Sequence, residues 1–144
     1  SENVNLSKSC NFICSEGETI SLADNYADIL TISFGIRNVS NREKCLNECF
    51  RILKPGGIFM CMEFSLPNDI VLRNLYDSWS YGLIPKLGKL IVGEEGPYKY
   101  LVDSIRTFPN PEEFNDMIIE AGFKKTTIKQ LTGNIVCIYR AEKI

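Results

Sequence analysis

The stretch DILTISFGIRNVSNREKCLNECFRILKPGGIFMCMEF, residues 28–64, decides the fold. Its first six residues, Asp28–Ser33, are rich in β-branched side chains and are apolar at successive positions, which predicts a parallel strand buried on both faces. A second unbroken apolar run, Ile58–Met62, predicts another strand. The segment between the two runs predicts a helix, because apolar residues recur there at helical spacing: Cys45, Leu46, Cys49, Phe50 and Leu53.

The two ends of this predicted helix carry their own signals. Ser40 and Glu43 form an S-x-x-E capping box at its start, and Pro55-Gly56-Gly57 stops it. A strand, a helix and a second strand in this order favour parallel strands joined by a right-handed crossover. Residues 28–64 therefore predict an α/β fold with parallel strands.

The flanking segments extend this pattern. Upstream, the apolar run Cys10–Cys14 predicts a further strand, which leads into a loop at Ser15-Glu16-Gly17. Downstream, residues 68–108 predict broken amphipathic helices, the last of which begins at Gly96-Pro97. Two apolar stripes mark these helices: Leu72, Leu75, Tyr76 and Trp79, then Tyr98, Leu101, Val102 and Ile105.

The C-terminal part of the chain predicts one helix and one hairpin. Asn110-Pro111 supplies an N-cap and a first-position proline, and Gly122 is the expected stop of this helix. Two extended runs follow, Thr126–Leu131 and Ile135–Tyr139, and a Thr-Gly-Asn turn joins them. An α/β chain that ends in an antiparallel hairpin narrows the choice of fold.

Composition excludes several classes of function. The 144 residues, 44% of them hydrophobic, suit one globular domain, and a net charge of −2 argues against a nucleic-acid partner. The sequence has no histidine, which excludes Ser-His-Asp and Cys-His catalysis within this stretch. Six cysteines occur without a C-x-x-C pair, which favours buried reduced thiols and a reducing compartment over a metal site. No run reaches the ~20 apolar residues that a membrane-spanning helix needs.

Several motifs together resemble one known family. The segment Arg51–Ser65, RILKPGGIFMCMEFS, resembles a signature of the ubiquinone/menaquinone biosynthesis C-methyltransferases, and the upstream string Thr31-Ile-Ser-Phe-Gly-Ile-Arg-Asn38 matches the same family. Further matches follow in order: Tyr98-x-Tyr100-Leu-Val-x-Ser104-Ile, Phe108-Pro109, Ala121-Gly122-Phe123 and Leu131-Thr132-Gly133. The matches cover nearly the whole chain, and their combination is specific.

The resemblance implies a Rossmann-like class I methyltransferase fold that is incomplete, with parallel strands, a C-terminal antiparallel hairpin and a helical insert. Residues 1–144 would form the C-terminal part of a single domain, and residues 68–108 would be a substrate lid. The family's glycine-rich cofactor loop is not found before Cys10. Because ligands of open α/β sheets bind beyond the central strands, we expect this chain alone to bind the cofactor poorly.

The resemblance also implies the chemistry. The cofactor would be S-adenosyl-L-methionine, without a metal, and the substrate a polyprenyl benzoquinol or naphthoquinol methylated on a ring carbon. Arg37 and Asn38 match the catalytic pair: Arg37 would stabilise the phenolate oxygen, and Asn38 would orient a water that takes the ring proton. Glu16 and Gly17 match positions at the adenine end of the cofactor, and Ser33 matches another cofactor contact.

Each of these assignments has a structural alternative. Glu16-Gly17 would otherwise be a plain turn, Ser33 an ordinary strand end, and Arg37 a surface charge beside an Asn38 that caps the next turn. Glu63 ends a buried strand, but a carboxylate satisfied by backbone donors or an arginine is equally consistent, so it stays outside the predicted catalytic set. The lid's apolar residues would either face a prenyl chain or cover a core: Tyr76, Trp79, Tyr81, Leu83, Leu87 and Ile91.

Other functions remain open. A methyltransferase of the same fold could act on another small acceptor, and a catalytically inactive fragment or scaffold subunit of a quinone-biosynthesis complex is the non-enzymatic alternative. We expect a cytoplasmic protein, or one peripheral to the inner membrane on the matrix side in a eukaryote. A homodimer or a quinone-biosynthesis complex is the expected assembly.

Overall fold

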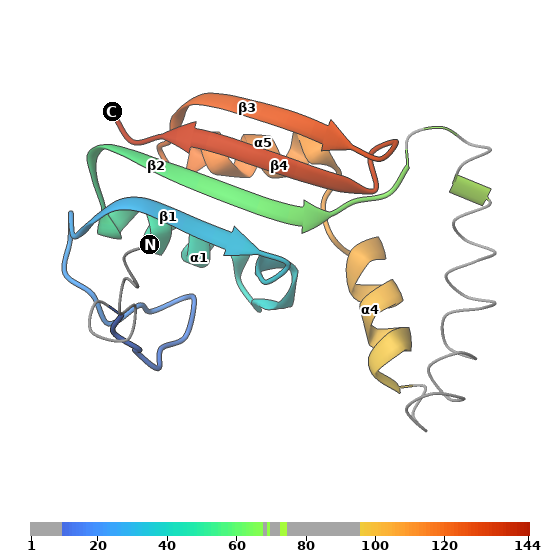
Figure 1. The fold of residues 1–144 in the computed structure, drawn as a ribbon, viewed down its shortest axis with the longest axis horizontal. Coiled ribbons are helices and arrows are strands. Elements are labelled where there is room, and N and C mark those ends of the chain that lie inside the picture. The colour runs from blue at the N-terminus through green and yellow to red at the C-terminus, as the bar shows by residue number, and fades with distance from the viewer. Residues whose placement is uncertain (1–9, 68, 70–72, 75–95) are drawn as a thin grey trace, which may run out of the picture.

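A mixed four-stranded sheet organises the chain (Figure 1). The computed structural model describes residues 10–67, 69, 73–74 and 96–144. The strands are β1 (Ala27–Ser33), β2 (Leu53–Phe64), β3 (Lys124–Leu131) and β4 (Val136–Glu142), in the order β1-β2-β4-β3. Between them lie the 3-10 turn η2 (Ile36–Asn38) and the helices α1 (Arg42–Ile52), α4 (Gly96–Arg106) and α5 (Pro111–Glu120).

The strand, helix, strand prediction is confirmed. β1 and β2 are parallel, with Leu30 opposite Phe59 and Ile32 opposite Cys61, and α1 connects them. The hairpin is confirmed too, because β3 and β4 are antiparallel and β4 also pairs antiparallel with β2. The predicted stripe from Leu72 to Trp79, and with it most of the lid, lies outside the described residues.

The core lies between one face of the sheet and the helices α1 and α5, which sit together behind it in Figure 1. Alternate residues of the strands point into this core, as a pleated sheet requires. Aromatic side chains fill its centre: the Phe59 and Phe123 rings lie 5.1 Å apart, and the Phe114 and Tyr139 rings 4.8 Å apart. Fully buried residues come from α1, β2, α5, β4 and the position before β3: Leu46, Cys49, Leu53, Phe59, Phe114, Ile118, Phe123, Cys137 and Ala141.

The start of α5 agrees with the prediction. Asn110 is the N-cap: its side chain accepts a hydrogen bond from the Glu113 backbone N–H, and the Glu113 side chain accepts one from the Asn110 backbone N–H. Gly122 follows the helix at φ +105°, a backbone conformation that L side chains rarely adopt. A Cβ there would also lie 3.0 Å from the Phe50 ring, so the glycine both ends the helix and admits the ring.

The predicted capping box of α1 is wrong by one residue. The N-cap is Asn41, whose side chain accepts from the Lys44 N–H at 2.9 Å, and not Ser40. Asn41 is held there because its own backbone N–H donates to the Glu18 carboxylate at 2.7 Å. A contact from a distant loop therefore decides between two adjacent residues that can both cap a helix.

Two strand predictions need correction. Residues 10–15 form no strand, and the side chains of Phe12 and Ile13 are exposed. β1 is an edge strand of the described sheet, and only one of its faces packs on the core, so Ile29 is 60% exposed. Both predictions assumed neighbouring elements that pair with the segment or cover both of its faces, and the described residues do not provide them.

The cysteines divide into two groups. Cys10 and Cys14 are exposed, contrary to the expectation of buried thiols, while the other four are buried as expected: Cys45, Cys49, Cys61 and Cys137. All six are free thiols. Burial raises the pKa of Cys61, and a hydrogen bond with Cys45 together with burial raises the pKa of Cys49, so these thiols stay protonated.

Candidate active site

The predicted catalytic pair lies where the parallel strands β1 and β2 end. After Ser33 the chain turns at Phe34, which has a left-handed φ of +54° although it is not glycine. The Phe34 N–H still donates to the Met62 carbonyl at 2.8 Å, and its ring packs 4.4 Å from the ring of Phe64. This turn places η2, which contains Arg37 and Asn38, at the carboxyl edge of the sheet.

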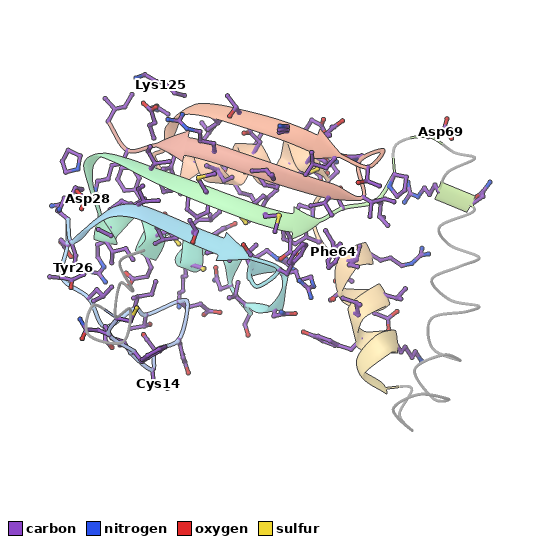
Figure 2. The ribbon with its side chains drawn as sticks, viewed as in Figure 1. Cys14, Tyr26, Asp28, Phe64, Asp69 and Lys125 are labelled. Carbon is purple, nitrogen blue, oxygen red and sulfur yellow. The ribbon has the colours of Figure 1, made fainter. Side chains whose placement is uncertain are left out.

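A buried ion pair fixes Arg37. Its Nη1 lies 2.8 Å from Oε1 of Glu63 on β2, and the two side chains are 10% and 0% exposed. The backbone N–H of Arg37 donates to the other Glu63 oxygen at 3.3 Å, and the N–H of Phe64 donates to Oε1 at 2.9 Å. The Arg37 guanidinium also lies over the ring of Phe64, which is labelled at the end of β2 in Figure 2. The Cζ atom of Arg37 is 5.5 Å from the ring centroid.

The guanidinium is held on two of its edges. Nη1 also donates to the Phe34 carbonyl, and Nε donates to the Ser104 hydroxyl on α4 at 3.3 Å. A guanidinium has five N–H groups, and within the described residues the two on Nη2 have no hydrogen-bond partner. Arg37 is therefore not the exposed surface charge of the structural alternative, and Nη2 is the group that it can offer to a ligand.

Glu63 is a satisfied structural carboxylate. Its oxygens accept from one charged and two backbone donors, which agrees with its exclusion from the predicted catalytic set. The sequence alone did not show that its partner is Arg37, since the two residues are 26 positions apart.

Asn38 lines a cavity together with Glu16 and Gly17, the two residues predicted at the adenine end of a cofactor. A cavity of about 280 Å³ is lined by Glu16, Gly17, Glu18, Asn38, Val39 and Ser40. The Oδ1 atom of Asn38 accepts a hydrogen bond from the Tyr100 hydroxyl of α4 at 3.0 Å. The structure thus brings together Glu16, Gly17 and Asn38, which are up to 22 positions apart in the sequence.

The loop that carries Glu16 and Gly17 is held by polar contacts. The Ser15 hydroxyl donates to the Thr19 carbonyl at 2.6 Å, and the Ile20 N–H donates to Glu48 on α1 at 2.9 Å. Gly17 lies close over α1, because a Cβ at this position would lie 3.3 Å from a Val39 methyl and 3.4 Å from the Cys45 sulfur. Only a small residue fits here without moving the loop.

Arg37 and Ser33 are the two predicted residues that do not line this cavity. The Arg37 side chain is bound to Glu63 and Ser104 instead. Ser33 is exposed at the end of β1 and is paired in register with Met62. Its predicted contact with a cofactor stays a prediction.

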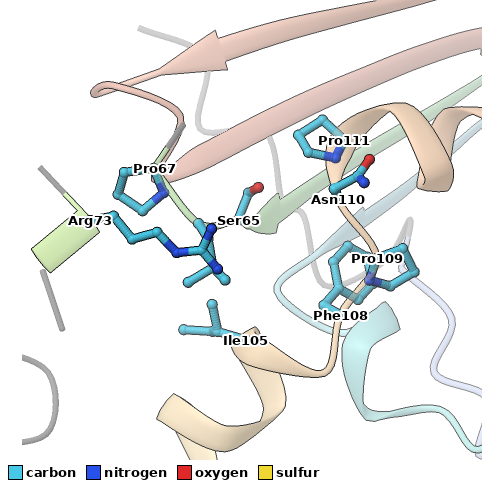
Figure 3. Close-up of a pocket in the computed structure, with 9 residues that line it drawn as sticks. Ser65, Pro67, Arg73, Ile105, Phe108, Pro109, Asn110 and Pro111 are labelled. Atoms are coloured by element: carbon cyan, nitrogen blue, oxygen red, sulfur yellow. The ribbon is translucent and has the colours of Figure 1, made fainter. Parts of the chain in front are cut away.

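A second cavity, of about 110 Å³, lies beyond the end of β2 (Figure 3). The side chain of Arg73 extends toward Ser65 and Ile105 in this view. The lining residues come from three segments: Ser65, Leu66 and Pro67, then Arg73, then Ile105 and Phe108–Pro111. The sequence did not indicate this cavity, although Ser65 and Phe108-Pro109 are part of the family motifs. No motif signals that these segments meet.

The similarity to known structures identifies the fold. A SAM-dependent methyltransferase from Thermotoga maritima matches 89% of this chain and 61% of its own length, with a TM-score of 0.62 at 20% identity. One from Aquifex aeolicus matches 93% of this chain and 55% of its own, with a TM-score of 0.56 at 16% identity. The fold is therefore the Rossmann-like fold of the class I SAM-dependent methyltransferases, as predicted.

The sequence defines the family within that class. The model of the ubiE/COQ5 methyltransferase family matches residues 2–143, and the chain belongs to that family. The mitochondrial 2-methoxy-6-polyprenyl-1,4-benzoquinol methylase of Rattus norvegicus is 47% identical over 92% of this chain and 41% of its own length. The ubiquinone/menaquinone biosynthesis C-methyltransferase of Rickettsia bellii is 44% identical over 98% of this chain and 57% of its own. The chain thus spans about half the length of these relatives.

Proposed function

We propose that this chain carries the phenolate-binding and proton-accepting part of a SAM-dependent C-methyltransferase that methylates a polyprenyl benzoquinol or naphthoquinol. The observation that carries the proposal is the buried arginine: Glu63 and Ser104 hold the Arg37 guanidinium, while its Nη2 keeps two donors for a ligand. The names of the rat and Rickettsia relatives support the substrate class.

The residues at the predicted adenine end fit part of the cofactor. Ligand sites that enclose a whole drug-sized molecule have volumes of ~300–1,000 Å³. The cavity beside Glu16 and Gly17, at about 280 Å³, falls just below that range. It therefore suits one portion of S-adenosyl-L-methionine, in which the Glu16 carboxylate accepts from the exocyclic amine and the ring lies against Gly17. When bound, the cofactor supplies the methyl group as an electrophile.

The mechanism assigns one task to each catalytic residue. The quinol reacts as its phenolate, and the two N–H groups of Arg37 Nη2 donate hydrogen bonds to the phenolate oxygen. After the ring carbon has taken the methyl group, this carbon loses its proton, and the negative charge returns to the same oxygen. A guanidinium donates hydrogen bonds and has no acceptor, so Arg37 binds the phenolate and does not take the proton. The Asn38 amide orients a water molecule, which accepts the ring proton.

Membrane contact and assembly remain predictions. Among the described residues, none of the helices has the length and hydrophobicity of a membrane span. We propose peripheral contact with the membrane that holds the prenylated substrate, on the matrix side where the organism has mitochondria. A homodimer or a quinone-biosynthesis complex is the proposed assembly. Flotation with liposomes and light scattering test these two proposals separately.

The test of the proposed function combines cofactor binding with methyl transfer. Calorimetric titration measures binding of S-adenosyl-L-methionine, and a short-chain demethylated quinol serves as acceptor in the activity assay. Both measurements use the full-length protein, because we expect this chain alone to bind the cofactor poorly. We expect Arg37→Ala to lower kcat by about 10²- to 10³-fold, the loss that follows removal of one oxyanion donor. Arg140→Ala is the matched control, because Arg140 pairs with Glu142 on β4.

Two results contradict the proposal. One is an Arg37→Ala variant with the kcat of the unsubstituted protein. The other is a protein that binds the cofactor but transfers no methyl group to any quinol acceptor, which would favour the scaffold alternative.

A further inference from the structure

Helix α4 contacts both members of the predicted catalytic pair. The Ser104 hydroxyl accepts from Nε of Arg37, and the Tyr100 hydroxyl donates to Oδ1 of Asn38. Tyr100 and Ser104 are four residues apart, so they lie one above the other on the same face of the helix. Two neighbouring residues of η2 are thus bound by one face of one helix, from positions more than 60 residues away in the sequence.

Ser104 has its hydroxyl oriented in advance. It donates its own proton to the Leu101 carbonyl at 2.9 Å, one turn back along α4, which leaves its oxygen lone pairs for the Arg37 Nε–H. Ser104 is only 8% exposed, and a hydrogen bond shielded from water is electrostatically stronger than an exposed one. Ser104 therefore fixes the Nε edge of the guanidinium, while Glu63 fixes Nη1. Together they set the direction of Nη2.

Tyr100 orients the other residue. By donating to Oδ1 of Asn38, its hydroxyl turns the amide oxygen toward α4 and the amide nitrogen away from it. Tyr100 is 58% exposed, so this bond lies at the surface, where Asn38 without a partner would rotate. The hydroxyl group of Tyr100, rather than packing of its ring, defines this contact.

We propose that Tyr100 and Ser104 are positioning residues, and that α4 aligns Asn38 and Arg37 with the substrate as one rigid unit. The proposal rests on the proposed function. A displacement of 1 Å from the reactive geometry can cost about 10²-fold in rate, so two hydrogen bonds that fix two catalytic side chains act mainly on kcat.

The test separates turnover from binding. We expect Ser104→Ala to lower kcat about 10- to 100-fold and Tyr100→Phe about 10-fold, with the KM for S-adenosyl-L-methionine unchanged. Ser104→Thr keeps the hydroxyl and restores most of the activity. Two control variants keep full activity. Tyr26→Phe removes a hydroxyl from a tyrosine that is also 58% exposed, and Thr107→Ala removes one that bonds only backbone carbonyls of α4.

A second readout is independent of activity. In ¹⁵N-edited spectra, we expect the Arg37 Nε–H to exchange slowly in the unsubstituted protein. We expect Ser104→Ala but not Thr107→Ala to accelerate this exchange. If Ser104→Ala changes neither the exchange nor kcat, or if Thr107→Ala lowers kcat equally, the positioning role is refuted. If the unsubstituted protein transfers no methyl group, the proposed function fails, and the exchange measurement alone decides whether α4 positions Arg37.

Discussion

Removing the Glu63 carboxylate is the perturbation whose cost follows most directly from the structure. Glu63 is fully buried and accepts from the Arg37 side chain at 2.8 Å, from the Arg37 backbone at 3.3 Å and from the Phe64 backbone at 2.9 Å. Glu63→Ala leaves the guanidinium, only 10% exposed, without its counter-ion. Breaking a buried pair from one side costs about 3–5 kcal/mol, a large fraction of the ~5–15 kcal/mol that stabilises a typical domain.

Urea unfolding followed by circular dichroism measures this cost. A domain of this size has an m-value of roughly 2 kcal/mol per M, so a loss of about 4 kcal/mol lowers the unfolding midpoint by about 2 M. Asp28→Ala is the matched control. It breaks the exposed Lys54–Asp28 pair, whose side chains are 44% and 81% exposed, and should cost no more than about 1 kcal/mol.

The double variant Arg37→Leu/Glu63→Leu sharpens the test. It removes both charges at once, so most of the stability lost in Glu63→Ala should return. Equal destabilisation by Glu63→Ala and Asp28→Ala would refute the buried pair. The pair would also be refuted if the double variant lost as much stability as Arg37→Leu and Glu63→Leu together, since the effects of coupled residues do not add.

Three further predictions concern backbone, charge and cavity. Gly122→Ala should lower the thermal unfolding midpoint by the equivalent of about 1–3 kcal/mol, because φ is +105° and Phe50 leaves no space for a Cβ. The Arg51 guanidinium lowers the pKa of Glu48 to about 2. The ionised Glu48 therefore stabilises the folded state fully above the unfolded pKa of 4.5, and this stabilisation is lost as pH falls toward 2. Unfolding between pH 5 and pH 2 should therefore be less pH-dependent in Glu48→Gln. Gly17→Val should weaken cofactor binding about tenfold in calorimetry while Gly17→Ala changes it little, since overpacking costs ~1–3 kcal/mol.

The parts of the fold that the sequence predicted have local signals. The apolar run Ile58–Met62 and the helical spacing before it specify a strand and a helix without reference to anything distant. The run lies within β2, and the residues at helical spacing lie within α1 except the last, Leu53, which begins β2. The Asn110 cap and the Gly122 stop of α5 are equally local, because a cap is a contact between residues three positions apart.

The errors arose where a distant contact decides. Ser40 and Asn41 are both good N-caps, and the hydrogen bond that the Asn41 backbone N–H donates to Glu18 selects between them. The run Cys10–Cys14 has the composition of a strand, but a strand also needs a neighbour to pair with. The same reasoning explains β1, where Ile29 is apolar and yet 60% exposed.

The candidate site divides in the same way. The place of Arg37 and Asn38 at the carboxyl edge of the sheet could be predicted, because they follow a strand in a recognisable string. Their catalytic role stays a prediction. Their supports could not be predicted, since Glu63 and Ser104 lie 26 and 67 positions from Arg37. Each support has an ordinary structural explanation when it is considered alone. Their significance depends on the guanidinium between them.

The pairing of Arg37 changes how it can act on a phenolate. An unpaired cation would attract any anion, but it would be solvated and free to rotate. Here the Glu63 carboxylate already balances the charge, so the net attraction for a distant anion is small. What remains is two N–H groups with a fixed direction, and donors that are already oriented stabilise developing charge without reorganising during the reaction. Arg37→Lys should therefore be about as inactive as Arg37→Ala, although it keeps the positive charge. An ammonium cannot bind Glu63, Ser104 and a phenolate in one plane.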